Sequence, residues 1–323
     1  MVINDKLNMT MNTITKDFRL LLASALAIVS CAKEISETPT EPDNSTPEYT
    51  TITLTAAHPV MTETGAAAQE NEGTAEISTK TTITIDGTTG SVSWVSGDKL
   101  KLVCEDGADF ITDALTEADI KEDGTATFKA TNVPAGKTLK WAVYPSEIVT
   151  SLTDGKFSVT VPQVQDGTFA KASIEVGEIG EDNSIALKNV CALLKFKVAD
   201  ANTTAAKVFI GGNGAPLNGT ATITSDILAT SYTNIEDIPD YQPNVEVDIT
   251  RPGTYYAAIL PAKTTGLSMQ IYSADNTLLA ENISSDVLDA PRKAIKNLGE
   301  LRSTPFQNLS LIHISEPTRR YAI

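Results

Sequence analysis

The chain has 323 residues, with 41 acidic side chains against 25 basic ones and a formal net charge of −16. Binding to nucleic acid depends on Lys and Arg neutralising phosphates, so this balance argues against a nucleic-acid partner. Hydrophobic residues make up 41% of the chain and charged residues 20%, which is enough apolar material for one or two cores. The length suggests two domains, and the recurrence of Thr, Val and Ile favours β-structure.

The N-terminus has the features of a secretory signal peptide. Basic residues precede the apolar run 20–29, which is too short to span a bilayer as a helix because that needs roughly 20 residues. Ser30 is a small residue of the kind that a signal peptidase pocket accepts. We therefore expect residues 1–30 to be removed, which makes Cys31 the mature first residue.

The four residues Ile-Val-Ser-Cys that end at Cys31 resemble the lipobox of bacterial lipoproteins. This resemblance implies that Cys31 carries a diacylglycerol and an acyl chain such as palmitate; an ordinary secretory signal is the alternative. Residues 31–48 are polar and rich in proline and acidic residues, which predicts a disordered tether. Acidic residues here resemble surface-export signals of some Gram-negative anaerobes, which would place the protein on the outer membrane; a simple spacer explains them as well.

The other end of the chain resembles translated adapter sequence. Residues 309–319 read Leu-Ser-Leu-Ile-His-Ile-Ser-Glu-Pro-Thr-Arg, which matches the translation of a common transposase-based sequencing adapter. We therefore expect 304–323 to be a tail of which 309–323 is an artefact. His313 is given no functional role, and the native C-terminus stays open.

From residue 50 onward, short period-two runs are separated by turn residues, as is typical of a sandwich or barrel. No long stretch has helical period. We expect polar or irregular segments at 58–80 and 226–242, and the polar composition at 177–184 predicts a crossing between two β-sandwich domains, 49–180 and 181–303. The expected strands are 51–55, 82–85, 92–94, 100–104, 125–128, 141–145, 157–161, 190–198, 207–210, 220–223, 245–249, 255–260, 267–272 and 294–298.

Residues of the types used for catalysis or metal binding are scarce between residues 50 and 303. Apart from His313 the only histidine is His58, so no Ser/His/Asp or Cys/His arrangement can be built. Cys104 and Cys191 have no C-x-x-C spacing, which argues against zinc. They could pair as a disulfide, but small buried hydrophobic residues are the favoured interpretation. We expect no enzyme activity, no cofactor and no metal.

Three further features have ordinary structural interpretations. The glycine-rich residues 211–214 follow a strand and lead to a proline, so they predict a β-turn and not a phosphate-binding loop. Most pairs of acidic residues lie in turn-like contexts, so solvated turn residues are the favoured interpretation. A catalytic pair of a glycosidase or a set of calcium ligands is the functional alternative. Trp94 and Trp141 lie in apolar alternating runs, so packing in the core is favoured over stacking on carbohydrate.

A set of motifs in a fixed order resembles the fimbrillin-like surface lipoproteins of Gram-negative anaerobes. The resemblance covers about residues 50–303, and each motif is weak alone. The motifs are a strand followed by Trp94-x-x-Gly97-Asp98, then Trp141–Pro145, Val161–Gln165, Ala192–Val198, Pro216–Gly219, Tyr255–Pro261 and Lys296–Gly299.

This resemblance implies two transthyretin-like Greek-key β-sandwiches and a role in type V pili. In that scheme a protease removes the first strand, and a strand from a neighbouring subunit fills the groove. Here the displaced strand would be 50–57, with Thr50, Ile52 and Leu54, and processing would follow Lys80. Polymerising subunits of the family are often cut by an arginine-specific protease, whereas no arginine occurs here from residue 20 to residue 250. This departure fits an anchor or accessory subunit as well as a stalk subunit.

Partners implied by this interpretation are the outer membrane through Cys31, other pilus subunits, and ligands on host or microbial surfaces. Two alternatives remain. The chain is a glycan-binding lipoprotein of a polysaccharide-uptake system, in which case Trp94, Trp141 or Tyr241 should be exposed. Otherwise it is the N-terminal part of a larger surface protein.

Overall fold

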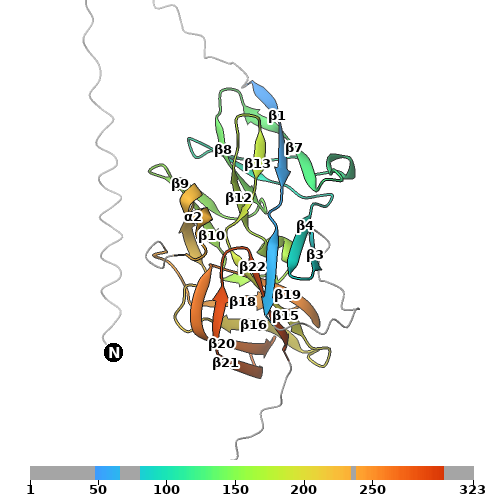
Figure 1. The fold of residues 1–323 in the computed structure, drawn as a ribbon, viewed down its shortest axis with the longest axis vertical. Coiled ribbons are helices and arrows are strands. Elements are labelled where there is room, and N and C mark those ends of the chain that lie inside the picture. Colours follow the sequence, from blue (N-terminus) through green and yellow to red (C-terminus); the bar gives the residue numbers. More distant parts are fainter. Residues whose placement is uncertain (1–47, 66–80, 234–237, 302–323) are drawn as a thin grey trace, which may run out of the picture. The chain divides into compact units, whose positions relative to one another are not determined.

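Strands dominate the structure, as the period-two runs predict. The computed structural model describes residues 48–65, 81–233 and 238–301, and almost all regular structure in them is β (Figure 1). This confirms the all-β fold class. The helices in the described chain are single turns, namely the 3₁₀ turn Glu117–Asp119, α1 (Phe169–Ala172) and α2 (Ser225–Ala229). The signal peptide, residues 31–47 of the tether including Cys31, Lys80 and the tail 304–323 lie outside the described residues.

Two sheets enclose one buried cluster formed largely by the first half of the chain. One sheet has the order β13-β1-β7, and the other β14-β12-β8-β5-β6. Leu54 and Phe128 of the first sheet share a buried cluster with Leu102 and Ala142 of the second. The strands are β13 (Ser184–Ala186), β1 (Tyr49–Ala57), β7 (Thr125–Pro134), β14 (Lys188–Asn189), β12 (Glu175–Glu178), β8 (Leu139–Tyr144), β5 (Lys101–Cys104) and β6 (Asp109–Ile111).

A six-stranded and a five-stranded sheet enclose a second buried cluster. Their orders are β19-β15-β22-β2-β4-β3 and β11-β18-β16-β20-β21. Phe196 and Tyr255 of the first share the cluster with Ile210 and Ile271 of the second. The strands are β19 (Gly253–Ile259), β15 (Ala192–Val198), β22 (Ala294–Leu301), β2 (Met61–Gly65), β4 (Thr89–Ser93), β3 (Thr82–Asp86), β11 (Val164–Gln165), β18 (Asn244–Asp248), β16 (Ala205–Gly211), β20 (Ala262–Ser273) and β21 (Leu278–Ala290).

A small sheet, β17-β10-β9, completes the set, with strands β17 (Gly219–Thr222), β10 (Lys156–Val161) and β9 (Thr150–Thr153). The turn between β9 and β10 is Asp154-Gly155, and both residues have positive φ, 52° and 71°. A two-residue hairpin of this type needs positive φ at both positions, which glycine adopts freely and aspartate tolerates. The turn therefore fixes the register of the hairpin.

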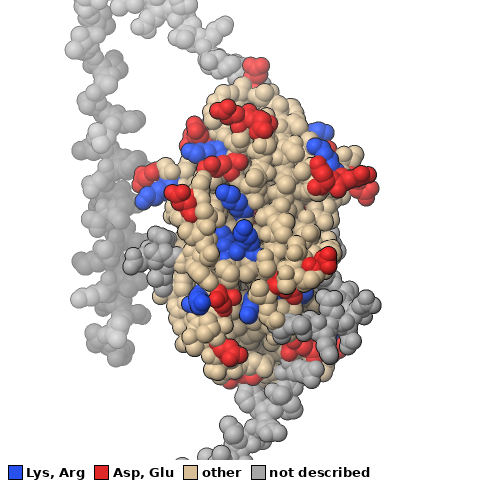
Figure 2. Space-filling model, viewed as in Figure 1, with Lys and Arg blue, Asp and Glu red and all other residues tan. Residues whose placement is uncertain are grey.

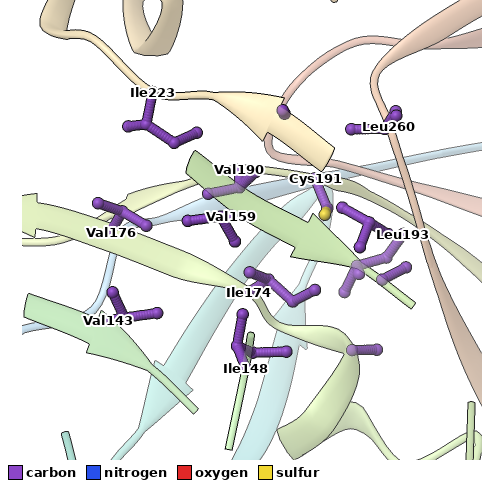
Figure 3. Packing of buried hydrophobic residues seen from close by; sticks show 14 of the residues in the cluster. Val143, Ile148, Val159, Ile174, Val176, Val190, Cys191, Leu193, Ile223 and Leu260 are labelled. Atoms are coloured by element: carbon purple, nitrogen blue, oxygen red, sulfur yellow. The ribbon is translucent and has the colours of Figure 1, made fainter. Parts of the chain in front are cut away.

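A third buried cluster joins residues from both halves of the chain. Val143, Val159 and Ile174 pack in it with Leu193 and, from β22, Ile295. Figure 3 shows several of these side chains pointing toward one another from different strands. The six-stranded sheet likewise combines strands from before and after the expected boundary at residue 180. The division into two domains therefore stays a prediction, and strands and core both cross it.

The structure corrects three local expectations. Residues 58–80 are not simply a polar loop, because Met61–Gly65 form strand β2 and Met61 is fully buried. The 13-residue strand β21 is missing from the sequence prediction. The irregular segment 226–242 includes most of helix α2. In each case too few apolar residues face the core to give a recognisable period.

Surface charge is mixed. On the face shown in Figure 2, basic side chains stand among acidic ones, with wide uncharged areas between them. Such a surface gives no continuous basic stripe on this face for a polyanion to follow. In the described part of the chain, no helix is long and apolar enough to cross a membrane.

Candidate functional site

The N-terminal segment Tyr49–Gly65 occupies a central position in two sheets. Its first strand, β1, lies between β7 and β13 and pairs antiparallel with β7 from Tyr49 opposite Pro134 to Ala57 opposite Thr125. On its other side β1 pairs in parallel with β13 over three residues. Loss of β1 would therefore expose the edges of two strands at once.

Strand β2 repeats this arrangement in the six-stranded sheet. It pairs in parallel with β22, from Thr62 opposite Ala294 to Gly65 opposite Asn297, and antiparallel with β4. Figure 1 shows the chain continuing from β1 directly into β2. The two strands thus form one extended segment that both sheets share.

The residues expected in the displaced strand differ in burial. Leu54 is 0% exposed and packs in the first core cluster, Ile52 is half-buried, and Thr50 is exposed. Period-two alternation puts these three on one face, and the face becomes buried only toward the C-terminal end of β1. Leu54 and Ala56 therefore anchor the strand, while its start is held mainly by backbone pairing with β7.

A buried hydrogen bond between His58 and Glu175 holds the connection between β1 and β2. His58 Nδ1 lies 2.7 Å from Glu175 Oε2, and the two side chains are 2% and 0% exposed. The Ser173 hydroxyl donates to Glu175 Oε1 at 2.7 Å, and the imidazole stacks on Trp94 with ring centroids 3.5 Å apart. Because Ser173 contacts the carboxylate and not the imidazole, this trio lacks the contact by which a base activates a nucleophile. It is an anchor for the segment.

A second buried group of polar side chains surrounds Thr81, the first described residue after Gly65. The Thr81 hydroxyl donates to Asp98 Oδ2. The hydroxyl of Tyr144 donates to Thr81 Oγ1 at 2.7 Å, and the backbone N–H of Val95 donates to Asp98 Oδ2 at 3.0 Å. Burial raises the pKa of Tyr144 well above its ordinary value, and the nearby Asp98 adds to the shift. The contacts of His58 thus hold Tyr49–Gly65 just before β2. The contacts of Thr81 hold the described chain just before β3.

Both tryptophans are buried. Trp94 is 4% exposed and Trp141 is 5% exposed, and Trp141 stacks on Phe157 at 5.0 Å. Neither offers a free face to a sugar ring, which counts against the glycan-binding alternative. Tyr241 is partly buried against the core that contains Trp141.

A hollow of about 350 Å³ lies beside the short strand β11. Pro145, Ile148 and Val164 supply apolar lining, and Lys171 and Asp166 stand at it as an ion pair of 2.8 Å. The cation of this hollow is therefore already neutralised. Among the described residues no group of three or more His, Cys, Asp or Glu could hold a metal.

Cys104 and Cys191 are both buried and not paired with one another. Burial raises the pKa of the Cys191 thiol to about 12. Small buried thiols of this kind behave as hydrophobic residues.

Sequence reasoning missed the part that His58, Glu175 and strand β2 play. The sequence has a single apolar residue in β2, Met61, and both its partner strand β22 and the Glu175 partner of His58 are more than a hundred residues away in the chain. Only the tertiary fold brings them together. Ser30, Cys31 and Lys80 remain outside the described residues, so their expected roles stay predictions.

Comparison with known proteins gives fold-level similarity alone. No protein-family model matches this sequence, and no curated protein matches it. A solved candidate cell adhesion protein from Bacteroides ovatus is 12% identical, covering 64% of this chain and 83% of that chain, with a TM-score of 0.40. One from Bacteroides fragilis is 12% identical, covering 78% and 93%, with a TM-score of 0.36.

A fimbrial assembly protein from Parabacteroides distasonis is 12% identical, covering 80% of this chain and 92% of that chain, with a TM-score of 0.32. Similarity at this level supports no argument about function. The geometry of the chain's own N-terminal segment has to carry that argument.

Proposed function

We propose that this protein is a lipid-anchored structural or adhesive protein of the cell surface, of fimbrillin type, that acts by assembly and not by catalysis. The observation that supports this is the placement of Tyr49–Gly65 between two partner strands in each of two sheets. A strand in such a position is exchangeable in principle, because another extended chain can make the same backbone hydrogen bonds.

Exchange would follow from a cut between β2 and β3. The segment would then be held by its backbone pairing, by Leu54 and by the His58–Glu175 hydrogen bond, with no covalent link to the rest of the chain. Its departure would leave the edges of β7 and β13 and of β22 and β4 without partners. A strand from a second subunit would satisfy those backbone groups, whereas water alone would leave the apolar groove under Leu54 exposed.

Lipid on Cys31 would attach the precursor to the outer membrane, and residues 31–48 would act as the tether. The other proposed partners are further subunits of a fimbrium and ligands on host or microbial surfaces. The proposal also covers an anchor subunit. Such a subunit would keep its lipid and its first strand, and it would need no proteolytic processing.

The assembly step is tested with the Cys31→Ser chain and a lysine-specific protease, followed by gel electrophoresis and mass spectrometry. Cleavage after Lys80 should release the segment and give oligomer ladders that survive detergent. The matched control is Lys80→Gln, which should stay uncut between β2 and β3 and remain monomeric. A chain that is cut after Lys80 and stays monomeric at high concentration would remove polymerisation from the proposal.

The lipid anchor is tested separately by labelling cells with an alkyne analogue of palmitate. The wild-type protein should carry the label and partition into detergent, and Cys31→Ser should do neither. Equal labelling of both chains would contradict the anchor.

A further inference from the structure

Three polar side chains from three neighbouring strands meet on one face of the six-stranded sheet. They are Glu63 of β2, Asn297 of β22 and Lys195 of β15. The register places Lys195 directly opposite Asn297, and it places Gly65 opposite Asn297 on the other side. Because strand side chains alternate with period two, Glu63 shares the face of Gly65 and therefore that of the other two.

The carboxylate bridges the amine and the amide. Lys195 Nζ lies 3.4 Å from both oxygens of Glu63, and the amide Nδ2 of Asn297 donates to Glu63 Oε1 at 2.8 Å. The backbone N–H of Gly299 donates to Asn297 Oδ1 at 2.9 Å. Asn297 is 5% exposed, and the Lys195 and Glu63 side chains are 18% and 14% exposed. A nucleophile, an acid–base group and a polarised carbonyl are therefore held together in a largely shielded site.

We propose that Lys195 and Asn297 form an intramolecular isopeptide bond, with Glu63 as the group that transfers protons. The bond that forms joins Lys195 Nζ to Asn297 Cγ, and the bond that breaks joins Cγ to Nδ2. The ammonium group and the amide become a secondary amide and an ammonium ion. The reaction needs no oxidant, no metal and no further reactant.

Each contact has a role in this reaction. Glu63 takes a proton from the Lys195 ammonium, and the resulting neutral amine attacks Cγ. The N–H of Gly299 stabilises the charge that grows on Asn297 Oδ1 as the carbonyl becomes tetrahedral. Glu63 then gives a proton to the amino group that it already contacts, which leaves as ammonia. The new amide nitrogen then releases a proton, which the ammonia takes up to become an ammonium ion. Glu63 has given back the proton that it took, so it ends as a carboxylate.

The fold supplies the proximity that such a reaction requires. Two groups fixed in register on adjacent strands react as parts of one molecule, which removes most of the entropic cost of bringing them together. The product would join β15 covalently to β22 and close the chain from residue 195 to residue 297. Because Glu63 lies in the segment proposed to be exchanged, the bond has to form before that segment leaves. The bond itself requires only the folded chain and is independent of assembly.

The test is peptide mass spectrometry of the folded full-length Cys31→Ser chain after trypsin digestion, with folding checked by circular dichroism. Formation of the bond blocks cleavage after Lys195 and joins peptide 189–197 to peptide 297–302. The joined species should be lighter than the sum of the two peptides by one ammonia, about 17 Da. Glu63→Gln should reduce the yield of this species at least tenfold, and Lys195→Arg should abolish it.

A matched control is offered by Lys207, which makes an ion pair with Glu246 at 3.5 Å between β16 and β18. Lys207→Arg should leave the joined species at the wild-type yield. Folded wild-type chain that gives only peptides 189–195 and 297–302 would overturn the proposal. A joined species of unchanged yield in Glu63→Gln would overturn the role of Glu63.

Discussion

At the scale of single residues, Asp98 is the acceptor at the centre of a buried hydrogen-bonded group. It is 3% exposed and accepts hydrogen bonds from the Thr81 hydroxyl and the backbone N–H of Val95, and the Tyr144 hydroxyl lies 3.3 Å from its Oδ1. Asp98→Ala leaves the Thr81 hydroxyl and the Val95 N–H without this acceptor, so we expect the free energy of unfolding to fall by about 3 kcal/mol or more. Denaturant titration followed by tryptophan fluorescence measures this, since Trp94 is nearby.

The control for Asp98→Ala is Tyr144→Phe, which removes one donor and keeps the acceptor. Its cost should be about 1 kcal/mol. Equal costs for the two variants would show that Asp98 is not the centre of this group.

The buried thiol of Cys191 predicts a pH dependence. Its pKa is raised from 9.0 to about 12 because burial penalises the thiolate. Above pH 9 the unfolded chain ionises this thiol and the folded chain does not, so the free energy of unfolding should fall by roughly 1.4 kcal/mol per pH unit from this group. Cys191→Ala should lose part of that slope, which denaturant titrations at several pH values measure.

Burial of Cys191 also predicts a low reactivity of its thiol. In the folded protein at pH 8 the thiol should resist alkylation, and labelling as fast as in the denatured chain would contradict its burial.

At the scale of elements, β1 is held unevenly. Leu54 is 0% exposed, whereas Thr53 next to it points to solvent. Leu54→Ala should therefore lower the free energy of unfolding by about 2–5 kcal/mol, and Thr53→Ala should change it by less than about 0.5 kcal/mol. Hydrogen exchange of the β1 amides should rise in the first variant only. Similar effects of both variants would mean that β1 is not docked as the structure has it.

The same element shows what the sequence could and could not predict. Alternation in 51–55 predicts β1 because every second side chain meets the core. In β2 only Met61 contacts a hydrophobic core, and Glu63 instead meets a polar partner from β22, so no period is visible. Pairing between β2 and β22 joins residues more than two hundred positions apart, and no local pattern specifies it. Burial of Trp94 follows from its apolar neighbours, but its stacking on His58 does not.

At the scale of the whole molecule, the question is whether the chain unfolds as one unit or as two. The described residues belong to a single compact unit, and the core cluster with Val143 and Ile174 also contains Leu193 and Ile295 from beyond the expected boundary. Strand β2 adds backbone pairing across that boundary. Elements that share a sheet and a core lose most of their stability when either partner unfolds, so we expect a single cooperative transition.

Calorimetry of the wild-type chain tests this expectation together with one variant in each outer core. Phe128 lies in the cluster that contains Leu54 of β1. Ile210 lies in the cluster between the six-stranded sheet and the sheet β11-β18-β16-β20-β21. Phe128→Ala and Ile210→Ala should each cost about 2–5 kcal/mol and lower the midpoint of the same single transition. Two transitions, with each variant shifting only one, would instead establish that 49–180 and 181–303 unfold independently. In that case Tyr49–Gly65 would have to detach from one half while it stayed bound to the other, and strand exchange would proceed in two steps.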